Sequence, residues 1–221
     1  IEKQPSGRVT MFSSELLLPG EVILQTGESY QTPEVAIIYS GNGFDKITDR
    51  SYRWLRSRPN HPTKLRPRPL TLNVWEAVYF DHNLEKLSEL ADVAKEIGVE
   101  RFVLDDGWFG ARRNDLQGLG DWVVSKDVWP EGLGPLIEKV NANGMEFGLW
   151  FEGEMIQVDS DLYRAHPEWI LNSHGRVPPS GRRQHVLDIT HPGAYQHVLD
   201  QVDKVLCDYN IAYIKWDHNK F

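Results

Sequence analysis

Two short acidic runs, each beside a tryptophan, contain the residues of this chain that are best suited to chemistry. Asp105 and Asp106 follow the run 101–104, and Asp217 follows Lys215 and Trp216 after the apolar run 212–214. Each pattern predicts carboxylates at the end of a short buried strand. Because the carboxyl ends of parallel strands meet at one face of an α/β barrel, we expect the two runs to share one pocket although they are far apart in the sequence.

Carboxylates in this arrangement are suited to the hydrolysis of a glycosidic bond. In a retaining reaction one carboxylate attacks the anomeric carbon, and a second carboxyl group protonates the leaving oxygen. Asp217 is the best candidate for the attacking group. Lys215, two residues earlier, should lie on the same side of the strand, where its charge would lower the pKa of Asp217. The alternative is an ordinary ion pair between Lys215 and Asp217.

Asp105 and Asp106 are adjacent acids, which would be unfavourable if both were buried without partners. Vicinal hydroxyls of a sugar would satisfy them, and so would the backbone amides of a following turn. Eight tryptophans and eight tyrosines, several of them beside acids and glycines, favour the sugar. Aromatic faces cover the apolar side of a pyranose ring while carboxylates accept hydrogen bonds from its hydroxyls.

A change of pattern near residue 69 divides the chain into two parts. Residues 1–69 contain short β-rich runs, turn signals and a linker rich in proline and arginine, and are predicted to be the C-terminal part of a β-sandwich domain with its linker. The β-rich runs are 9–12, 22–26 and 34–39, the turn signals are Pro19-Gly20 and Gly41–Gly43, an amphipathic stretch covers 46–56, and the linker covers 57–69.

Residues 70–221 alternate between strand and helix patterns. Asn83 should cap the first helix, and Gly98 should end it. The predicted strands are 72–77, 101–104, 146–151 and 211–216, and the predicted helices are 83–97, 133–143 and 191–209. No Gly-rich nucleotide fingerprint follows the first strand. The pattern therefore predicts an α/β fold, the first half of a (β/α)8 TIM barrel.

Composition restricts the partners of this chain. A net charge of −8 argues against nucleic acid, and the absence of an apolar run of membrane-spanning length argues against a membrane. The spacing of the histidines does not indicate a metal site, so we expect no metal or other cofactor. Cys207 is the only cysteine and is expected to be a buried thiol, which fits a reducing, cytoplasmic setting.

Several blocks, in order through residues 70–221, together resemble the α-galactosidases of glycoside hydrolase family 36, the melibiases. The blocks are LNVWEA at 72–77, FVLDDGWFG at 102–110, LGDW at 119–122, FGLWFEGEM at 147–155, SDLYRAHP at 160–167 and IKWD at 214–217. Residues 1–69 resemble the end of that family's N-terminal β-sandwich through the weaker blocks LPGE at 18–21 and TPE at 32–34.

The resemblance implies a retaining α-galactosidase that removes terminal α-galactosyl residues from sugars such as melibiose and raffinose through a covalent glycosyl-aspartate intermediate. It implies that Asp217 is the nucleophile and that the aspartate pair favours galactose through its axial 4-hydroxyl. Either Arg182 or Arg183 matches the arginine that reaches the sugar, because the Arg-Arg pair leaves the register open, and we favour Arg182. The implied substrate contacts are Trp75, Asp105, Asp106, Trp150, Arg182, Lys215 and Asn219.

The chain departs from the family pattern in two ways. Gly153 stands where many members have proline, and the acid/base aspartate of the family comes from a later strand, beyond Phe221. Glu152 and Glu154 are expected to have supporting roles, and the chain by itself is expected to be inactive. The alternatives are a related galactosyl-transferring enzyme of the raffinose synthase type and a non-catalytic, sugar-binding or truncated fragment. A homo-oligomer, such as a tetramer, of the full-length enzyme is a further expectation.

Overall fold

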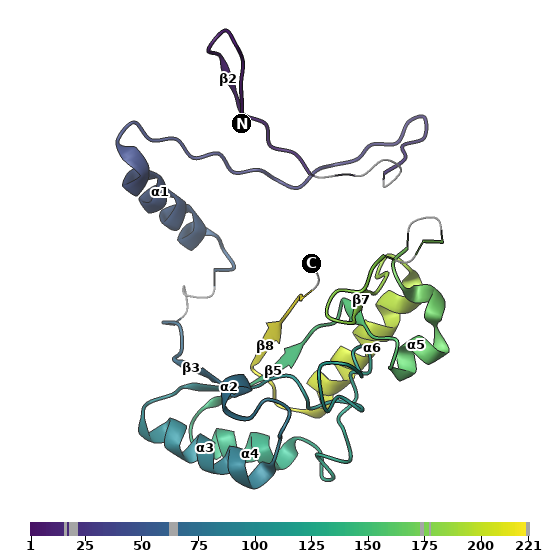
Figure 1. Cartoon of the computed structure of the whole chain (residues 1–221). Helices are drawn as coiled ribbons and strands as arrows, with labels where there is room; N and C mark the ends of the chain where they lie inside the picture. Colours follow the sequence, from purple (N-terminus) through teal and green to yellow (C-terminus); the bar gives the residue numbers. More distant parts are fainter. Residues whose placement is uncertain (16, 18–21, 62–65, 173–174, 177, 220–221) are drawn as a thin grey trace. The chain divides into compact units, whose positions relative to one another are not determined.

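A computed structural model describes residues 1–15, 17, 22–61, 66–172, 175–176 and 178–219 (Figure 1). The chain divides into two compact units, Ile1–Arg68 and Pro69–Phe221. The predicted turn signal Pro19-Gly20, the block 18–21, Pro62 of the linker and Phe221 lie outside the described residues.

The first unit contains little regular structure. Strands β1 (Glu2–Lys3) and β2 (Val9–Thr10) form a short antiparallel pair, and helix α1 (Gly43–Ser57) contains the amphipathic stretch 46–56. The β-rich runs 22–26 and 34–39 form no strand with any other described segment, and their apolar side chains, such as Ile23 and Ile37, are exposed. β-rich composition does not produce a strand without a hydrogen-bonding neighbour. The β-sandwich therefore stays a prediction.

The second unit is built on a parallel sheet of four strands. These are β3 (Thr71–Asn73), β4 (Arg101–Leu104), β5 (Glu146–Phe151) and β8 (Tyr213–Trp216), in the order β3-β4-β5-β8. Phe102 is paired with Phe147 between β4 and β5, and Trp150 with Lys215 between β5 and β8. The predicted α/β character and parallel sheet are confirmed. Because all four strands run the same way, their carboxyl ends lie along one edge of the sheet.

Three longer helices connect these strands. They are α3 (Leu84–Glu96), α4 (Gly134–Ala142) and α6 (Pro192–Asp208), close to the predicted ranges, and Figure 1 shows α3 and α4 side by side along the sheet. The Oδ1 atom of Asn83 accepts a hydrogen bond from the amide of Lys86 at 3.0 Å, which confirms the predicted cap. Gly98 has a φ of 83°, the left-handed conformation predicted for the helix end.

The core of this unit packs the sheet against its helices. Phe102, Leu104, Phe147 and Leu149 are fully buried, and each such side chain contributes about 1.5–3 kcal/mol through removal from water. Cys207, in contrast, is exposed, so its predicted burial is wrong. The buried face of α6 carries Ala194, Val198 and Val205, and Cys207 lies on a different face of that helix.

The first strand is shorter than predicted. Strand β3 ends at Asn73, and a short helix, α2 (Trp75–Val78), begins two residues later. The Oδ1 atom of Asn73 accepts a hydrogen bond from the amide of Trp75 at 2.9 Å, which turns the chain at this point. The predicted strand over 72–77 is therefore wrong beyond Asn73, because a local side-chain bond ends it.

A small subdomain between β5 and α6 was not predicted. It contains the antiparallel pair β6 (Met155–Ile156) and β7 (His185–Val186), helix α5 (Asp161–Ala165) and a 3-10 turn at Pro167–Trp169. These elements are too short for a periodic pattern. They share a separate cluster of buried side chains, which includes Leu162, Trp169 and Leu187.

Candidate active site

The two acidic runs meet, as the sequence predicts. The Nζ atom of Lys215 lies 2.8 Å from Oδ2 of Asp105, a contact across 110 residues of sequence. Lys215 therefore pairs with Asp105, and the alternative ion pair with Asp217 is not formed. Asn73, at the end of β3, also donates to Oδ2 of Asp105, and the amide of Asp106 donates to Oδ1 at 2.9 Å. Protein groups thus satisfy the buried Asp105 carboxylate.

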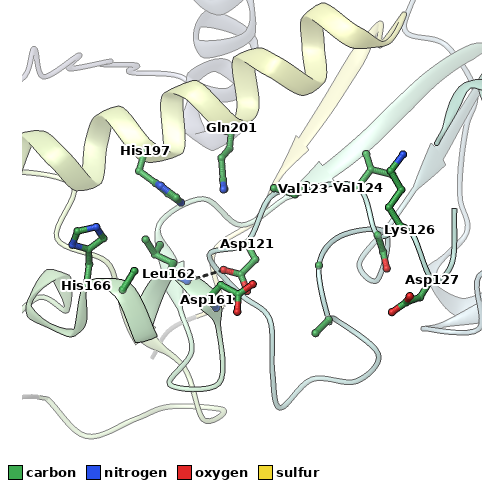
Figure 2. Close-up of a pocket in the computed structure, with 14 residues that line it drawn as sticks. Asp121, Val123, Val124, Lys126, Asp127, Asp161, Leu162, His166, His197 and Gln201 are labelled. Carbon is green, nitrogen blue, oxygen red and sulfur yellow. Dashed lines mark hydrogen bonds between the residues drawn. The ribbon is translucent and has the colours of Figure 1, made fainter. Parts of the chain in front are cut away.

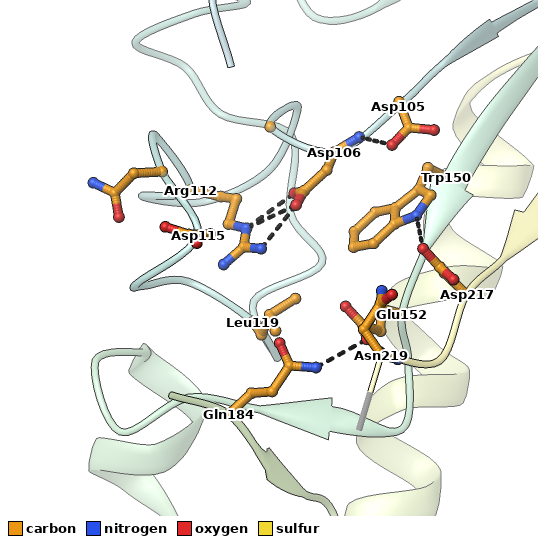
Figure 3. A network of polar contacts seen from close by, with 12 residues as sticks. Asp105, Asp106, Arg112, Asp115, Leu119, Trp150, Glu152, Gln184, Asp217 and Asn219 are labelled. Carbon is orange, nitrogen blue, oxygen red and sulfur yellow. Dashed lines mark hydrogen bonds and ion pairs between the residues drawn. The ribbon is translucent and has the colours of Figure 1, made fainter. Parts of the chain in front are cut away.

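Asp106 is held by a different cation, Arg112, which the sequence reasoning missed. The Nε atom of Arg112 donates to Oδ1 of Asp106 at 2.9 Å, and Nη2 donates to Oδ2 at 2.7 Å (Figure 3). Both side chains are buried. Burial raises the pKa of Asp106 even though the Arg112 guanidinium favours its charged form. One sequence feature could have revealed it: two adjacent buried acids need positively charged partners, and Arg112 is a nearby arginine.

The Arg112 guanidinium is itself held on its other side. Its Nη1 atom donates to Oε1 of Gln157 at 2.9 Å and to the carbonyl oxygen of Gln117 at 3.0 Å. This network fixes the planar guanidinium, and a fixed bidentate partner fixes the Asp106 carboxylate in turn. Each of the two adjacent buried acids therefore has its own cation. Asp105 is paired with Lys215, and Asp106 is paired with Arg112.

Asp217 is placed where it can act as an anion. Its Oδ2 atom accepts a hydrogen bond from the indole Nε1 of Trp150 at 3.0 Å, and its Oδ1 atom accepts one from the amide of His218 at 3.0 Å. Burial opposes ionisation of Asp217, but hydrogen bonds from Asn219, Trp150 and His218, together with the charge of Lys215, lower its pKa. An ionised carboxylate at this position is what nucleophilic attack requires.

The two tryptophans of the prediction have different environments. Trp150 is only 2% exposed and lies nearly parallel to Phe109, with ring centroids 6.1 Å apart. Its indole nitrogen contacts Asp217, and its role as a substrate contact stays a prediction. Trp75 is half-buried and stands edge-on to the rings of Tyr79 and Phe80. Trp75 lies two residues after Asn73, which donates to Asp105. Its backbone is therefore close to the acidic cluster, which consists of Asp105, Asp106 and Asp217.

Glu152 holds the segment after β8. It is 1% exposed, and its Oε1 atom accepts hydrogen bonds from the amide of Asn219 at 2.7 Å and from Nε2 of Gln184 at 3.0 Å (Figure 3). Burial raises the pKa of Glu152, and the nearby charge of Asp217 raises it further. Glu152 and Asp217 are thus neighbouring carboxyls whose pKa values move in opposite directions.

Arg182 and Arg183 form an exposed two-residue turn. Their φ angles are 52° and 59°, and the turn joins Gly181 to Gln184, which are paired as an antiparallel bridge. Within the described part of the chain, neither guanidinium donates a hydrogen bond to the acidic cluster. Gln184 is the buried residue of this hairpin and contacts Glu152. The sequence reasoning missed it because hairpin register decides which side chain points inward.

A separate pocket of about 570 Å³ lies beside α6 and α5 (Figure 2). Its lining includes Asp121, His197 and Gln201 but none of the predicted sugar-contacting residues. Oδ2 and Oδ1 of Asp121 accept hydrogen bonds from the amides of Asp161 and Leu162, both at 2.9 Å, which caps α5. Burial raises the pKa of Asp121. Asp121 therefore has a structural partner, and the acidic cluster remains the better candidate for chemistry.

Two kinds of feature are absent from the part of the chain that the structure describes. No cluster of three or more histidine, cysteine, aspartate or glutamate side chains there has a geometry that could bind a metal ion. No helix among the described residues has the length and apolar character needed to cross a membrane.

Comparison with known proteins points to one family. A family model described as Melibiase matches residues 29–221. An α-galactosidase from Escherichia coli is 39% identical over 219 residues, which are 99% of this chain and 31% of that protein. The α-galactosidase AgaA from Geobacillus stearothermophilus is 43% identical over 199 residues, 90% of this chain and 27% of that protein. The chain thus spans about a third or less of the length of these relatives.

Solved structures show the same similarity in three dimensions. A variant of the glycoside hydrolase family 36 α-galactosidase AgaA from Geobacillus stearothermophilus, in complex with stachyose, superposes with a TM-score of 0.84 at 42% identity, over 89% of this chain and 28% of that chain. The α-galactosidase AgaB from the same organism superposes with a TM-score of 0.68 at 46% identity, over 70% of this chain and 21% of that chain.

Proposed function

Because this chain belongs to the melibiase family, the α-galactosidases of glycoside hydrolase family 36, we propose that it forms part of the catalytic domain of a retaining α-galactosidase. The observation that carries the proposal is the position of Asp217. Its carboxylate has a lowered pKa, is oriented by Trp150, and lies at the same sheet edge as the paired acids Asp105 and Asp106. We also propose that the four parallel strands belong to a (β/α)8 barrel.

In this proposal Asp217 is the nucleophile. One of its carboxylate oxygens attacks the anomeric carbon of an α-galactosyl group while the bond from that carbon to the leaving oxygen breaks. The leaving oxygen takes a proton from a general acid, which we assign to no residue of this chain. Water then attacks the anomeric carbon of the covalent glycosyl-aspartate, and the bond from that carbon to Asp217 breaks. The general acid, now deprotonated and acting as a base, accepts a proton from the attacking water. Galactose is released with its original configuration, and Asp217 is restored.

The paired aspartates would recognise the sugar. Each carboxylate oxygen has two lone pairs, so Asp105 and Asp106 can accept hydrogen bonds from sugar hydroxyls while keeping their protein partners. Lys215 and Arg112 hold these acceptors in place. We propose that they contact the axial 4-hydroxyl and its neighbours and thereby favour galactose. Trp75, Arg182 and Asn219 remain proposed sugar contacts, and Trp150 contributes by orienting Asp217.

The proposed substrates are oligosaccharides with terminal α-galactosyl residues, such as melibiose and raffinose. Support comes from relatives of this chain, since variants of AgaA from Geobacillus stearothermophilus were solved in complex with stachyose and with raffinose. Transfer of galactose to another sugar would use the same nucleophile. The two reactions are distinguished by their products when an acceptor sugar is added: hydrolysis releases free galactose, and transfer attaches the galactose to the acceptor.

Covalent labelling tests the proposal directly. The protein is incubated with a galactose-configured inactivator that leaves a stable glycosyl group on a retaining nucleophile, and the label is mapped by peptide mass spectrometry. We expect one label, on Asp217, and none in Asp217→Ala or with the glucose-configured analogue. A label on another carboxylate would contradict the assignment of Asp217. Saturable galactose binding without label or turnover would instead support a non-catalytic, sugar-binding protein.

A further inference from the structure

The segment that carries Asp217 is held by a second glutamate besides Glu152, namely Glu154. Its Oε1 atom accepts a hydrogen bond from the indole Nε1 of Trp216 at 3.1 Å, and its Oε2 atom lies 2.9 Å from Nδ1 of His218. Trp216 and His218 are the two sequence neighbours of Asp217. A single carboxylate therefore contacts the residues on both sides of Asp217.

Glu154 forms no hydrogen bond with Asp217 itself, whose carboxylate is bound by Trp150 and by the amide of His218. Side chains alternate between the two sides of an extended chain, so Trp216 and His218 are expected to leave the backbone on the side opposite to Asp217. Apart from the through-space effect of its charge, Glu154 then acts on Asp217 through these two neighbours. The two carboxylate oxygens of Glu154 contact two different side chains, which fixes the orientation of the carboxylate.

Gly153 makes this arrangement possible. A Cβ atom at position 153 would lie 2.5 Å from Cη2 and 2.7 Å from Cζ2 of Trp216, which is too close for any side chain. The Trp216 ring can therefore approach the loop after β5 only because residue 153 is glycine. The same ring lies over Phe151, with centroids 6.3 Å apart. Gly153 gives Trp216 room, and Glu154 then binds its indole nitrogen.

We propose that Glu154 is a positioning residue, which fixes the Asp217 carboxylate by binding Trp216 and His218 together, with Gly153 providing the space. This inference rests on the proposed role of Asp217 as nucleophile. For both contacts to be hydrogen bonds, the Nδ1 atom of His218 must carry a hydrogen, because a glutamate oxygen can only accept. Without Glu154, the torsions on both sides of Asp217 are freed, and the carboxylate samples positions from which attack is slower.

The test compares three variants of the complete enzyme of which this chain is proposed to form a part. Glu154→Ala removes both contacts, while Glu154→Gln keeps an oxygen for the Trp216 indole and an amide that can donate to an unprotonated Nδ1 of His218. Glu168→Ala is the matched control, because Glu168 makes the same kind of contact to Nδ1 of His166, at 3.0 Å, away from Asp217. Turnover of an α-galactoside is measured together with the melting temperature of each variant.

For Glu154→Ala we expect kcat to fall on the order of 10- to 100-fold with KM nearly unchanged, because a misplacement of about 1 Å can cost about 100-fold. Glu154→Gln should recover most of this loss, and Glu168→Ala should match the parent protein. A parental kcat in Glu154→Ala would overturn the proposal. A loss in Glu154→Gln as large as that in Glu154→Ala would also overturn it, because the conservative variant keeps partners for Trp216 and His218.

A second measurement separates this inference from the proposed function. The protein is labelled with 5-fluorotryptophan, and the ¹⁹F resonance of residue 216 is identified by its loss in Trp216→Phe. The resonance should move in Glu154→Ala and stay in place in Glu154→Gln and Glu168→Ala. Absence of turnover in the complete parent enzyme would contradict the proposed function alone. An unmoved resonance in Glu154→Ala would overturn the role of Glu154 whatever the activity.

Discussion

The ion pair between Lys215 and Asp105, with 2.8 Å between Nζ and Oδ2, joins the ends of β8 and β4 although β5 lies between them in the sheet. Strands separated by one neighbour are about 9.5 Å apart, so the lysine side chain must extend across the end of β5 to reach the aspartate. The charge of Lys215 therefore lies above the sheet edge, where it acts on both Asp105 and Asp217.

Replacing Lys215 by methionine should change the pH dependence of activity. Burial opposes ionisation of Asp217, and the hydrogen bonds around it and the charge of Lys215 outweigh that effect and lower its pKa. Without the charge the pKa rises, so the acid limb of kcat/KM should move to higher pH. Lys204→Met, which removes an exposed lysine paired with Asp208 at 2.8 Å, is the control. An unmoved acid limb in Lys215→Met would contradict the predicted coupling.

Replacing Arg112 by alanine should strongly destabilise the second unit. The Asp106 carboxylate would lose its bidentate partner while remaining buried, and breaking a buried ion pair in this way costs about 3–5 kcal/mol. The free energy of unfolding, measured by urea titration, tests this. Arg164→Ala, which removes exposed ion pairs with Asp159 and Asp161, should have little effect. A similarly small effect of Arg112→Ala would refute the prediction.

Replacing Glu152 by glutamine should stabilise the protein more at high pH than at low pH. Burial raises the pKa of Glu152, so the native state binds more protons than the unfolded state as pH rises through the carboxyl range, and stability falls. Glutamine removes this loss while keeping an oxygen that can accept from Asn219 and Gln184. Unfolding in urea at acidic and at mildly alkaline pH gives the difference, with the exposed Glu89→Gln as control. A difference that is independent of pH would rule out the effect.

Replacing Gly153 by alanine should displace Trp216 and destabilise the protein. The new Cβ would lie 2.5 Å from the Trp216 ring, and overpacking of this kind typically costs about 1–3 kcal/mol. Gly134→Ala is a matched control, because its Cβ meets open space in helix α4 and should be neutral or stabilise by up to about 1 kcal/mol. Thermal unfolding of both variants decides the matter, and equal melting temperatures would contradict the contact.

Features that depend on nearby residues could be predicted from the sequence. The strands 101–104 and 146–151 are short apolar runs, and the helix capped by Asn83 has both a start signal and a stop signal within its own residues. The predictions that failed lack such local determinants. The runs 22–26 and 34–39 have β-rich composition but pair with no strand among the residues that the structure describes. Strand β3 ends early because Asn73 binds the amide of Trp75.

In the candidate site, too, local features could be predicted from the sequence and contacts between distant residues could not. Placing Asp105, Asp106 and Asp217 at strand ends was possible from sequence, because each follows an apolar run. The partners of these acids were not predicted, because Arg112 lies in an irregular loop and Lys215 was expected beside Asp217 rather than Asp105. The inward position of Gln184, next to the exposed Arg182, depends on a hairpin register that side-chain chemistry alone does not determine.

The available chemical groups can be read from the amino-acid sequence: three strand-end aspartates, a lysine two residues before one of them, and the family blocks that surround them. How the charges of these groups are paired depends on the folded chain. Strand order brings Lys215 to Asp105, loop packing brings Arg112 to Asp106, and burial brings the Trp150 indole to Asp217. The physical reason is that ion pairs and pKa values depend on distance and burial, which arise when distant segments pack together.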